Sequence, residues 1–267
     1  MKRNIFTVVL CTAVLFIASA HVHAQDTTST RSKWLDDYPK KVGFTWGASL
    51  EAHANYIWRG LRIGGLCHQG SATVGYGGAY VDAWWSLGAT DWQLDKFMPE
   101  VDVTVGFRRW GLDVNFIYIC NFSGPKNDAG EIRVKYKVSN KLPLSLQITT
   151  RPGFKDHYYT EAGEKVRAYS TYFELGYDFA LPYDLAISPR VGFTPWKSLY
   201  TGYRGDFAVN NISMTLAKAW NVKTFMDVNV FAAIMTNPWV ISYEQRQGQG
   251  LSANGLMFDA GVKVSFK

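Results

Sequence analysis

The chain contains few of the residues that cross-link proteins or bind metals. Cysteine occurs three times in 267 residues, and Cys11 lies inside the apolar N-terminal segment. Cys67 and Cys120 are then left, and two cysteines are too few for the usual four-ligand zinc site. In an exported chain they could form one disulfide, and two free thiols are the alternative. We expect neither a metal nor a cofactor.

Long apolar runs are also missing beyond the N-terminus. No stretch after residue 24 approaches the roughly 18 apolar residues that a membrane-spanning helix needs. The HExxH, CxxC and phosphate-loop patterns do not occur. The 28 basic and 22 acidic residues leave a charge of +6, and the basic residues are spread along the chain. A mild, scattered charge does not indicate a nucleic-acid partner.

Residues 1–24 predict a secretory signal peptide. Lys2 and Arg3 precede an apolar run from Ile5 to Ala20, and Val22-His23-Ala24 offers a cleavage site before Gln25. A membrane anchor is the alternative, but this run is short for a span. Removal of the signal lowers the net charge to +4. Residues 25–42 are polar and predict a periplasmic lead-in, and residues 43–267 predict one domain.

After residue 43 the chain alternates between apolar and polar positions. Val101–Arg108 places Val and Phe on one face and Asp, Thr, Gly and Arg on the other, and Ile132–Val138 and Phe258–Phe266 do the same. We expect about twelve such strands, with gaps that are alternately long and short. The short gaps are 77–78, 110–111, 139–142, 181–183 and 220–222, and the long ones are roughly 59–69, 89–98, 121–130, 153–167, 195–206 and 237–250. Short periplasmic turns and long outer loops are typical of outer-membrane barrels.

Aromatic residues near the ends of the apolar faces suggest which way these faces point. Trp58, Phe107, Tyr118, Phe179, Phe193 and Phe266 lie near strand ends. Aromatic belts are typical of the two membrane interfaces. A soluble sheet with its apolar face inward is the alternative. We predict an all-β fold, a single closed antiparallel transmembrane β-barrel in the bacterial outer membrane. Broken alternation between Phe207 and Asn211 predicts a β-bulge.

If the apolar faces meet lipid, the polar faces line the lumen. These faces carry similar numbers of acids and bases, which predicts ion-paired walls and a narrow lumen. Bases cluster between residues 133 and 151, and this separation of charge would tune selectivity among charged solutes. A purely structural charge network is the alternative. The predicted lumen acids are Glu51, Asp82, Asp102, Asp113, Glu174, Asp178, Asp227 and Asp259, and the bases are Arg108, Arg133, Lys135, Lys137, Arg151, Arg190, Lys218 and Lys263.

The predicted first strand, from Trp46 to Trp58, ends in a short motif. Tyr56-Ile57-Trp58-Arg59-Gly60 precedes a glycine-containing loop, a small-residue strand at Gly70–Tyr76 and the pair Trp84-Trp85. This arrangement, over about residues 44–120, resembles the TorF-like family of bacterial outer-membrane porins, long catalogued as conserved hypothetical proteins. The resemblance implies an outer-membrane barrel with a transport role, no established substrate, and motif residues Tyr56, Arg59 and Gly60. From the residues alone, Tyr56 would be a rim aromatic and Arg59 an ion-pair partner in the lumen.

Three classes of function follow. The leading expectation is passive passage of small solutes, and the runner-up is a non-conducting barrel that binds through aromatic-rich loops. A lipid-modifying enzyme would need His68 or His157 to meet a nucleophile such as Ser71. Nothing in their spacing requires this, so we predict no enzyme. The expected partners are outer-membrane lipid, lipopolysaccharide, small solutes and the barrel-assembly machinery, which would bind the C-terminal strand ending in Phe266.

Overall fold

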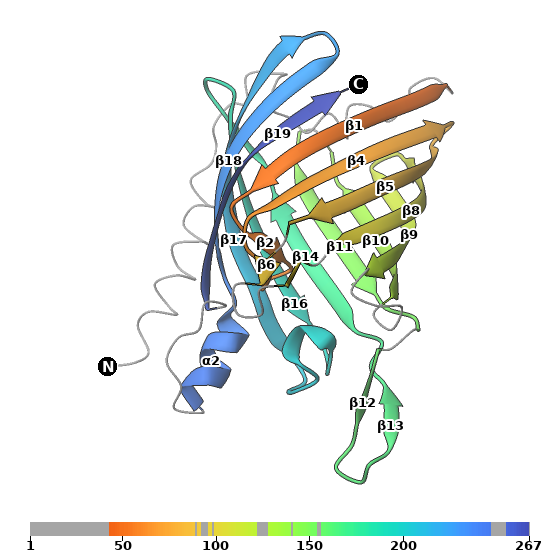
Figure 1. Ribbon diagram of the computed structural model, residues 1–267, viewed down its shortest axis with the longest axis vertical. Helices are drawn as coiled ribbons and strands as arrows, with labels where there is room; N and C mark the ends of the chain where they lie inside the picture. The colour runs from red at the N-terminus through yellow and green to blue at the C-terminus, as the bar shows by residue number, and fades with distance from the viewer. Residues whose placement is uncertain are drawn as a thin grey trace.

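The computed structural model describes residues 43–266, with gaps at 89, 92–95, 98, 122–127, 140, 154–155 and 247–254. The predicted signal peptide and lead-in therefore lie outside the described residues. Nearly all of the described chain is β-structure (Figure 1).

Twelve antiparallel strands form a closed ring, which confirms the predicted fold. In ring order each strand pairs with the next, and the ring closes because β14 also pairs with β16. A short strand, β15 (Phe179–Leu181), lies beside β16 outside this count. The wall strands are β1 (Phe44–His53), β4 (Cys67–Tyr76), β5 (Ala79–Leu87), β8 (Glu100–Arg109), β9 (Leu112–Asn121), β10 (Ala129–Lys137), β11 (Leu144–Thr150), β14 (Thr171–Tyr177), β16 (Leu185–Thr194), β17 (Ala208–Lys223), β18 (Met226–Thr236) and β19 (Leu256–Phe266).

The first and last wall strands join through a continuous register. Ala48 pairs with Phe266, Glu51 with Lys263, and His53 with Gly261. With this pairing the sheet has no open edge, so every wall strand has a hydrogen-bonded neighbour on both sides. Closure removes the unpaired backbone groups that a bilayer would leave unsatisfied.

The predicted bulge is confirmed in the long strand β17. The register with β16 shifts between Gly192 and Phe193, where the partners change from Asn211 to Val209. Asn210 is the extra residue and is fully buried. The bulge restores the alternation of the following residues, so that Ile212, Met214 and Leu216 share one face.

Tight turns join strands at the end of the barrel that we call the short-turn end. Gly77-Gly78 and Trp110-Gly111 have positive φ, as two-residue hairpins between twisted strands require. The predicted gap at 220–222 is wrong. Trp220 and Asn221 still pair with β18, and β17 continues to Lys223 past a second irregularity in the register.

The opposite end carries the longer connections, and we call it the long-loop end. It holds α2 (Pro238–Arg246) and the 3₁₀ turn η2 (Leu199–Thr201), and the hairpin of β12 and β13 projects from it (Figure 1). Among the described residues no helix is both long and apolar enough to cross a bilayer. The hairpins at this end are β2 (Tyr56–Trp58) with β3 (Leu61–Gly64), β6 (Thr90–Asp91) with β7 (Lys96–Phe97), and β12 (His157–Tyr159) with β13 (Lys165–Arg167).

The first strand is shorter than predicted. β1 ends at His53, and Tyr56–Trp58 pairs with Leu61–Gly64 in a separate hairpin instead of continuing the wall. Tyr56 is buried against Cys67, and Trp58 packs on this pair. The prediction that Tyr56 and Trp58 extend the lipid-facing side of the first strand is therefore wrong. Their rings are covered by other parts of the barrel interior.

Candidate functional site in the barrel lumen

The register of the strands shows which side chains share the inner face. Glu51 pairs with Lys263 on one side and Gln69 on the other, and directly paired residues point to the same side of a sheet. The next positions point outward, and there Leu50 and Val105 are each 56% exposed. An apolar outer surface around a polar interior is the arrangement that lipid requires.

The register places nearly all the predicted lumen residues on this inner face. Asp82, Thr104 and Ile117 form one row across β5, β8 and β9, and Asp113, Lys135 and Gln147 form another across β9, β10 and β11. Asp178 and Arg151 lie just beyond β14 and β11 and contact inner-face residues. The predicted residues on the inner face are Glu51, Asp82, Asp102, Arg108, Asp113, Arg133, Lys135, Lys137, Glu174, Arg190, Asp227, Asp259 and Lys263.

Lys218 is the exception, because it lies on the outer face. It pairs with Val230, which pairs in turn with the exposed Val262. The Lys218 Nζ lies 5.3 Å from the centroid of the Trp220 ring, close to the short-turn end. A long lysine can bury its stem against lipid while its charge reaches the interface. The predicted role of Lys218 in the lumen is therefore wrong.

Several acids and bases of the inner face are joined by ion pairs. Arg108 Nε lies 2.9 Å from Asp113 Oδ2, and Lys263 Nζ lies 2.7 Å from Glu51 Oε1. Arg190 donates to the Asp178 carboxylate. Each pair joins neighbouring strands or strand ends, so these ion pairs cross-link adjacent strands on the inner face of the wall.

A histidine that sequence reasoning left out of the lumen set completes one of these groups. His53 Nδ1 lies 2.8 Å from Asp259 Oδ2, and its Nε2 lies 3.2 Å from Glu51 Oε2. The ring also packs 5.0 Å from that of Phe231. His53 had the same alternation as Glu51, and this was the available signal for its inward position.

The β2–β3 hairpin reaches from β1 across the interior to other walls. Asn237, which follows β18, donates a 3.0 Å hydrogen bond to the Gly60 carbonyl. At the tip, Arg59 has φ +50° and Gly60 has φ +79°, the positive values of a two-residue hairpin turn. A Cβ on Gly60 would lie 1.8 Å from the Asn210 carbonyl oxygen on β17. Only glycine allows so close an approach of the two backbones.

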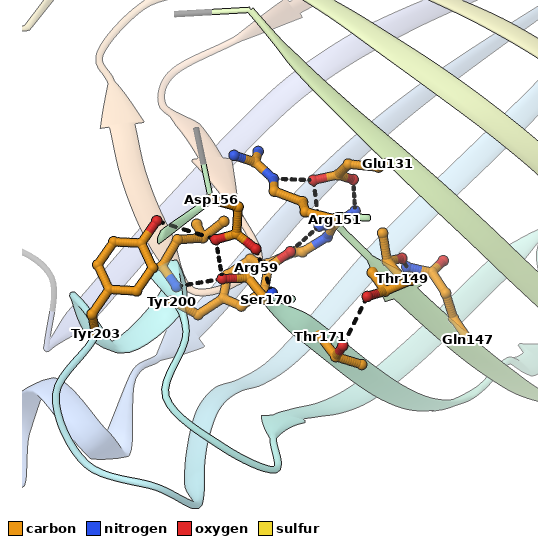
Figure 2. A network of polar contacts seen from close by, with 12 residues as sticks. Arg59, Glu131, Gln147, Thr149, Arg151, Asp156, Ser170, Thr171, Tyr200 and Tyr203 are labelled. Atoms are coloured by element: carbon orange, nitrogen blue, oxygen red, sulfur yellow. Dashed lines mark hydrogen bonds and ion pairs between the residues drawn. The ribbon is translucent and has the colours of Figure 1, made fainter. Parts of the chain in front are cut away.

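Arg59 anchors this tip to the opposite wall. Its Nη1 and Nη2 lie 3.1 and 2.7 Å from the two carboxylate oxygens of Glu131 on β10. Arg151, beyond β11, adds a bond from Nε to Glu131 Oε1 at 3.0 Å. Figure 2 shows both guanidinium groups directed at this one carboxylate. We call Arg59, Glu131 and Arg151 the latch. Glu131 is 1% exposed, so its charge depends on these partners.

Aromatic rings surround the guanidinium of Arg59. Its Cζ lies 4.5 Å from the ring centroid of Trp58 and 5.3 Å from that of Tyr172. The Tyr200 hydroxyl accepts a hydrogen bond from Arg59 Nη1. Burial raises the pKa of Tyr200, so its phenol is neutral at physiological pH. Ring faces attract a desolvated cation, so Trp58, Tyr172 and Tyr200 stabilise the Arg59 guanidinium in addition to its ion pair with Glu131.

A second anchor lies beside the latch at the base of the β12–β13 hairpin. The Asp156 carboxylate accepts hydrogen bonds from the Ser170 hydroxyl at 2.6 Å and the Tyr203 hydroxyl at 3.2 Å (Figure 2). The rings of Tyr158 and Tyr203 stack with centroids 6.2 Å apart. Tyr200 and Tyr203 belong to the same loop, which therefore contacts both anchors.

Sequence reasoning missed the acids that matter most here. Glu131 and Glu100 each directly precede a stretch that the alternation identified as strand, and neither was included among the predicted lumen acids. Their spacing of two from Arg133 and Asp102 was the signal for an inner-face position. Glu100 accepts a 3.2 Å bond from the Tyr56 hydroxyl, so the predicted rim position of Tyr56 is wrong.

The two cysteines do not form a disulfide. Both are free, Cys67 on β4 and Cys120 on β9. β5 and β8 separate these strands, and three strand spacings amount to about 14 Å. Disulfides need Cα atoms within about 7 Å.

Among the residues that the structure describes, neither histidine considered for catalysis is hydrogen-bonded to a serine, threonine or cysteine side chain. His68 pairs with Ala52 and Leu87 on the outer face, whereas Ser71 pairs with Ser49 on the inner face. His157 lies in the separate β12–β13 hairpin, 5.8 Å from the Tyr159 ring. Within the described ranges no group of three His, Cys, Asp or Glu side chains is arranged to hold a metal ion.

The closed ring, apolar outer face and charged interior define a transmembrane β-barrel of the bacterial outer-membrane type. No protein-family model matches the chain, and no curated protein does. The TorF-like assignment therefore stays a prediction.

Structure comparison finds solved outer-membrane proteins that are similar to this chain at low sequence identity. The NanC porin is 10% identical with a TM-score of 0.49, over 82% of this chain and 99% of that protein. The KdgM porin is 9% identical with a TM-score of 0.43, over 83% and 98%. OmpF of Salmonella typhi is 10% identical with a TM-score of 0.35, over 85% and 97%. The class assignment accordingly rests on the strand pairing and outer face of this chain.

Proposed function

We propose that this barrel is a passive channel that passes small solutes through a narrow, charged lumen. The observation that carries the proposal is the inner face, where charged side chains of β1, β5, β8, β10, β14, β16 and β19 share one interior. A lumen lined with charge holds water, and water-filled lumens of barrels conduct. The long-loop end would face outward and the short-turn end the periplasm.

The β2–β3 hairpin would set the narrow point of this pathway. It joins the wall at Glu131 on β10 and approaches β17 at Asn210. A segment that crosses a lumen reduces its free cross-section, so only small solutes would pass. The latch holds this segment at a fixed depth because both Glu131 oxygens are bonded.

Single-channel recording in planar bilayers tests the proposal. The refolded mature chain should give discrete conductance steps, with steps larger in Glu131→Gln because the hairpin loses its anchor. Folded protein is identified beforehand by its far-ultraviolet circular dichroism and its heat-dependent gel mobility. Absence of channel events from folded protein at high concentration would refute the proposed channel function.

Charge reversal tests whether the cationic wall of β10 lies in the pathway. Replacing Arg133, Lys135 and Lys137 with Glu should shift the reversal potential in a salt gradient toward cation selectivity. Lys218→Glu is the matched control, because Lys218 lies on the outer face of the same barrel. An unchanged reversal potential in the triple variant would exclude these side chains from the ion path.

The second candidate is a non-conducting barrel that acts through its loops. The several contacts that hold the β2–β3 hairpin across the interior favour it. The same recordings separate the two functions, because this candidate expects no conductance until the latch is broken. For either function, we propose lipopolysaccharide and outer-membrane lipid as partners of the outer face. The barrel-assembly machinery would bind β19.

A further inference from the structure

Six cations of the inner wall fall into two groups. Arg108, Arg190 and Lys263 each reach a carboxylate on a neighbouring strand or strand end, and Arg151 reaches Glu131. Arg133 and Lys135, two residues apart on β10, form no ion pair or hydrogen bond through their side chains with any described residue. Both lie on the inner face by register.

The two acids on the neighbouring strands closest in register, Asp113 and Glu174, are engaged by other side chains. Asp113 pairs across from Lys135, yet its Oδ1 accepts from the Tyr80 hydroxyl at 2.7 Å and its Oδ2 bonds Arg108. Glu174, one strand beyond Gln147, accepts a 2.7 Å bond from the Tyr172 hydroxyl and lies 4.0 Å from Arg190. Among the described residues, neither cation therefore has a carboxylate oxygen within ion-pair distance, although Asp82 and Asp102 lie close enough to attract Arg133, and Glu174 and Asp178 close enough to attract Lys135.

Polar donors complete the surroundings of Arg133 and Lys135. Their partners on β11 are Thr149 and Gln147, which lie beside the latch in Figure 2. Gln147 Nε2 lies 3.4 Å from Thr149 Oγ1, a weak internal contact that a ligand could replace. Alternate residues of a strand are about 7 Å apart, so one small anion lies within reach of both cations. Lys135 is exposed as a residue, and Arg133 is half-buried.

We propose that Arg133 and Lys135, with Gln147 and Thr149, form a binding site for small solutes that carry a phosphate or carboxylate group. An oxyanion would take charge-assisted hydrogen bonds from the guanidinium and the ammonium, and further bonds from the amide and hydroxyl. The site lies two residues from Glu131, on the short-turn side of the latch. It rests on the proposed channel function in that its ligand would be a permeating solute.

Calorimetric titration tests this site without requiring conduction. The full chain, refolded in a neutral detergent such as octyl glucoside, is titrated with inorganic phosphate and separately with citrate. Saturable binding is expected in the wild type. Arg133→Gln and Lys135→Gln should each weaken it about tenfold, in line with the loss of one charge-assisted bond, and the double variant should abolish it. Added sodium chloride should weaken binding through competition and screening.

The matched control removes the same two residue types elsewhere. Lys165→Gln with Arg167→Gln deletes a lysine and an arginine on β13, outside the wall, and should leave the affinity unchanged. Equal loss in this control would show a general charge effect and overturn the site, as would absence of saturable binding in the wild type. Conductance is recorded on the same preparations. Binding without channel events would refute the channel function but support the anion site. Channel events without binding would support the channel function but refute the anion site.

Discussion

Two hairpins of the long-loop end take opposite courses. The β2–β3 hairpin turns into the barrel, and its tip is held by a buried ion pair between Arg59 and Glu131. The β12–β13 hairpin projects outward, and its base is held by Asp156 through neutral hydroxyl and backbone donors. Their turn glycines, Gly60 and Gly163, both have φ +79°.

This difference shows what position in the barrel demands of an anchor. A tip that carries a cation into a desolvated interior needs an opposite charge with matching geometry, because an unpaired buried charge is costly. A hairpin in water needs its base fixed, and neutral donors suffice. The inner anchor should therefore be the more sensitive of the two to substitution.

The largest expected effect is on the inner anchor. Glu131→Gln leaves Arg59 and Arg151 without their shared carboxylate and should lower the free energy of unfolding by about 3–5 kcal/mol. Asp156→Asn should cost about 1–3 kcal/mol, because it weakens bonds from neutral donors. Urea unfolding in lipid vesicles, followed by tryptophan fluorescence, measures both values. A loss in Asp156→Asn that equals or exceeds that in Glu131→Gln would contradict the comparison.

An intermediate effect is expected at the two turn glycines. Gly60→Ala combines the strain of a positive φ with a clash against the Asn210 carbonyl, whereas a Cβ on Gly163 would meet nothing within 4 Å. Gly163→Ala should thus cost only the strain, about 1–2 kcal/mol, and Gly60→Ala clearly more. The difference in unfolding free energy between the two variants isolates the clash. Equal costs would mean that the inner tip can withdraw freely from β17.

The smallest effect concerns the outer anchor and pH. Burial, followed by the charge of Asp156, raises the pKa of Tyr203 from 10.0 to about 12. The bond from Tyr203 to Asp156 is therefore fully present below pH 10, and its contribution to stability is lost as the pH rises toward 12. The stability difference between wild type and Tyr203→Phe should shrink over this interval. A difference that grows with pH would contradict the assignment.

Strand faces could be predicted from the sequence because alternation survives in most of the wall strands. The ring and the bulge before Ile212 followed from that pattern. Lys218 was predicted to face the lumen because it is charged. Its spacing of two and four residues from Leu216 and Met214 would have placed it on the outer face. Near an interface a lysine can lie on the lipid side, so charge alone does not identify the lumen.

The latch could not be predicted in full, for a different reason. Arg59 was expected to pair in the lumen, but its partner lies 72 residues away on β10. No local pattern links the two, and the inward turn after His53 depends on contacts with walls formed later in the chain. The unpaired state of Arg133 and Lys135 is equally invisible in sequence, because it depends on which carboxylates other side chains have already engaged.

The pairing of β1 with β19 is also expected to be a late step of assembly. Glu51 and Lys263 are separated by 212 residues, so closure brings together the most distant parts of the ring. Contacts of such long range form late, because the intervening chain must first be ordered. Until then β1 and β19 are both open edges, which can pair with another chain. An unfinished barrel of this kind is therefore a state that the cell must shield, and removal of β19 would make that exposure permanent.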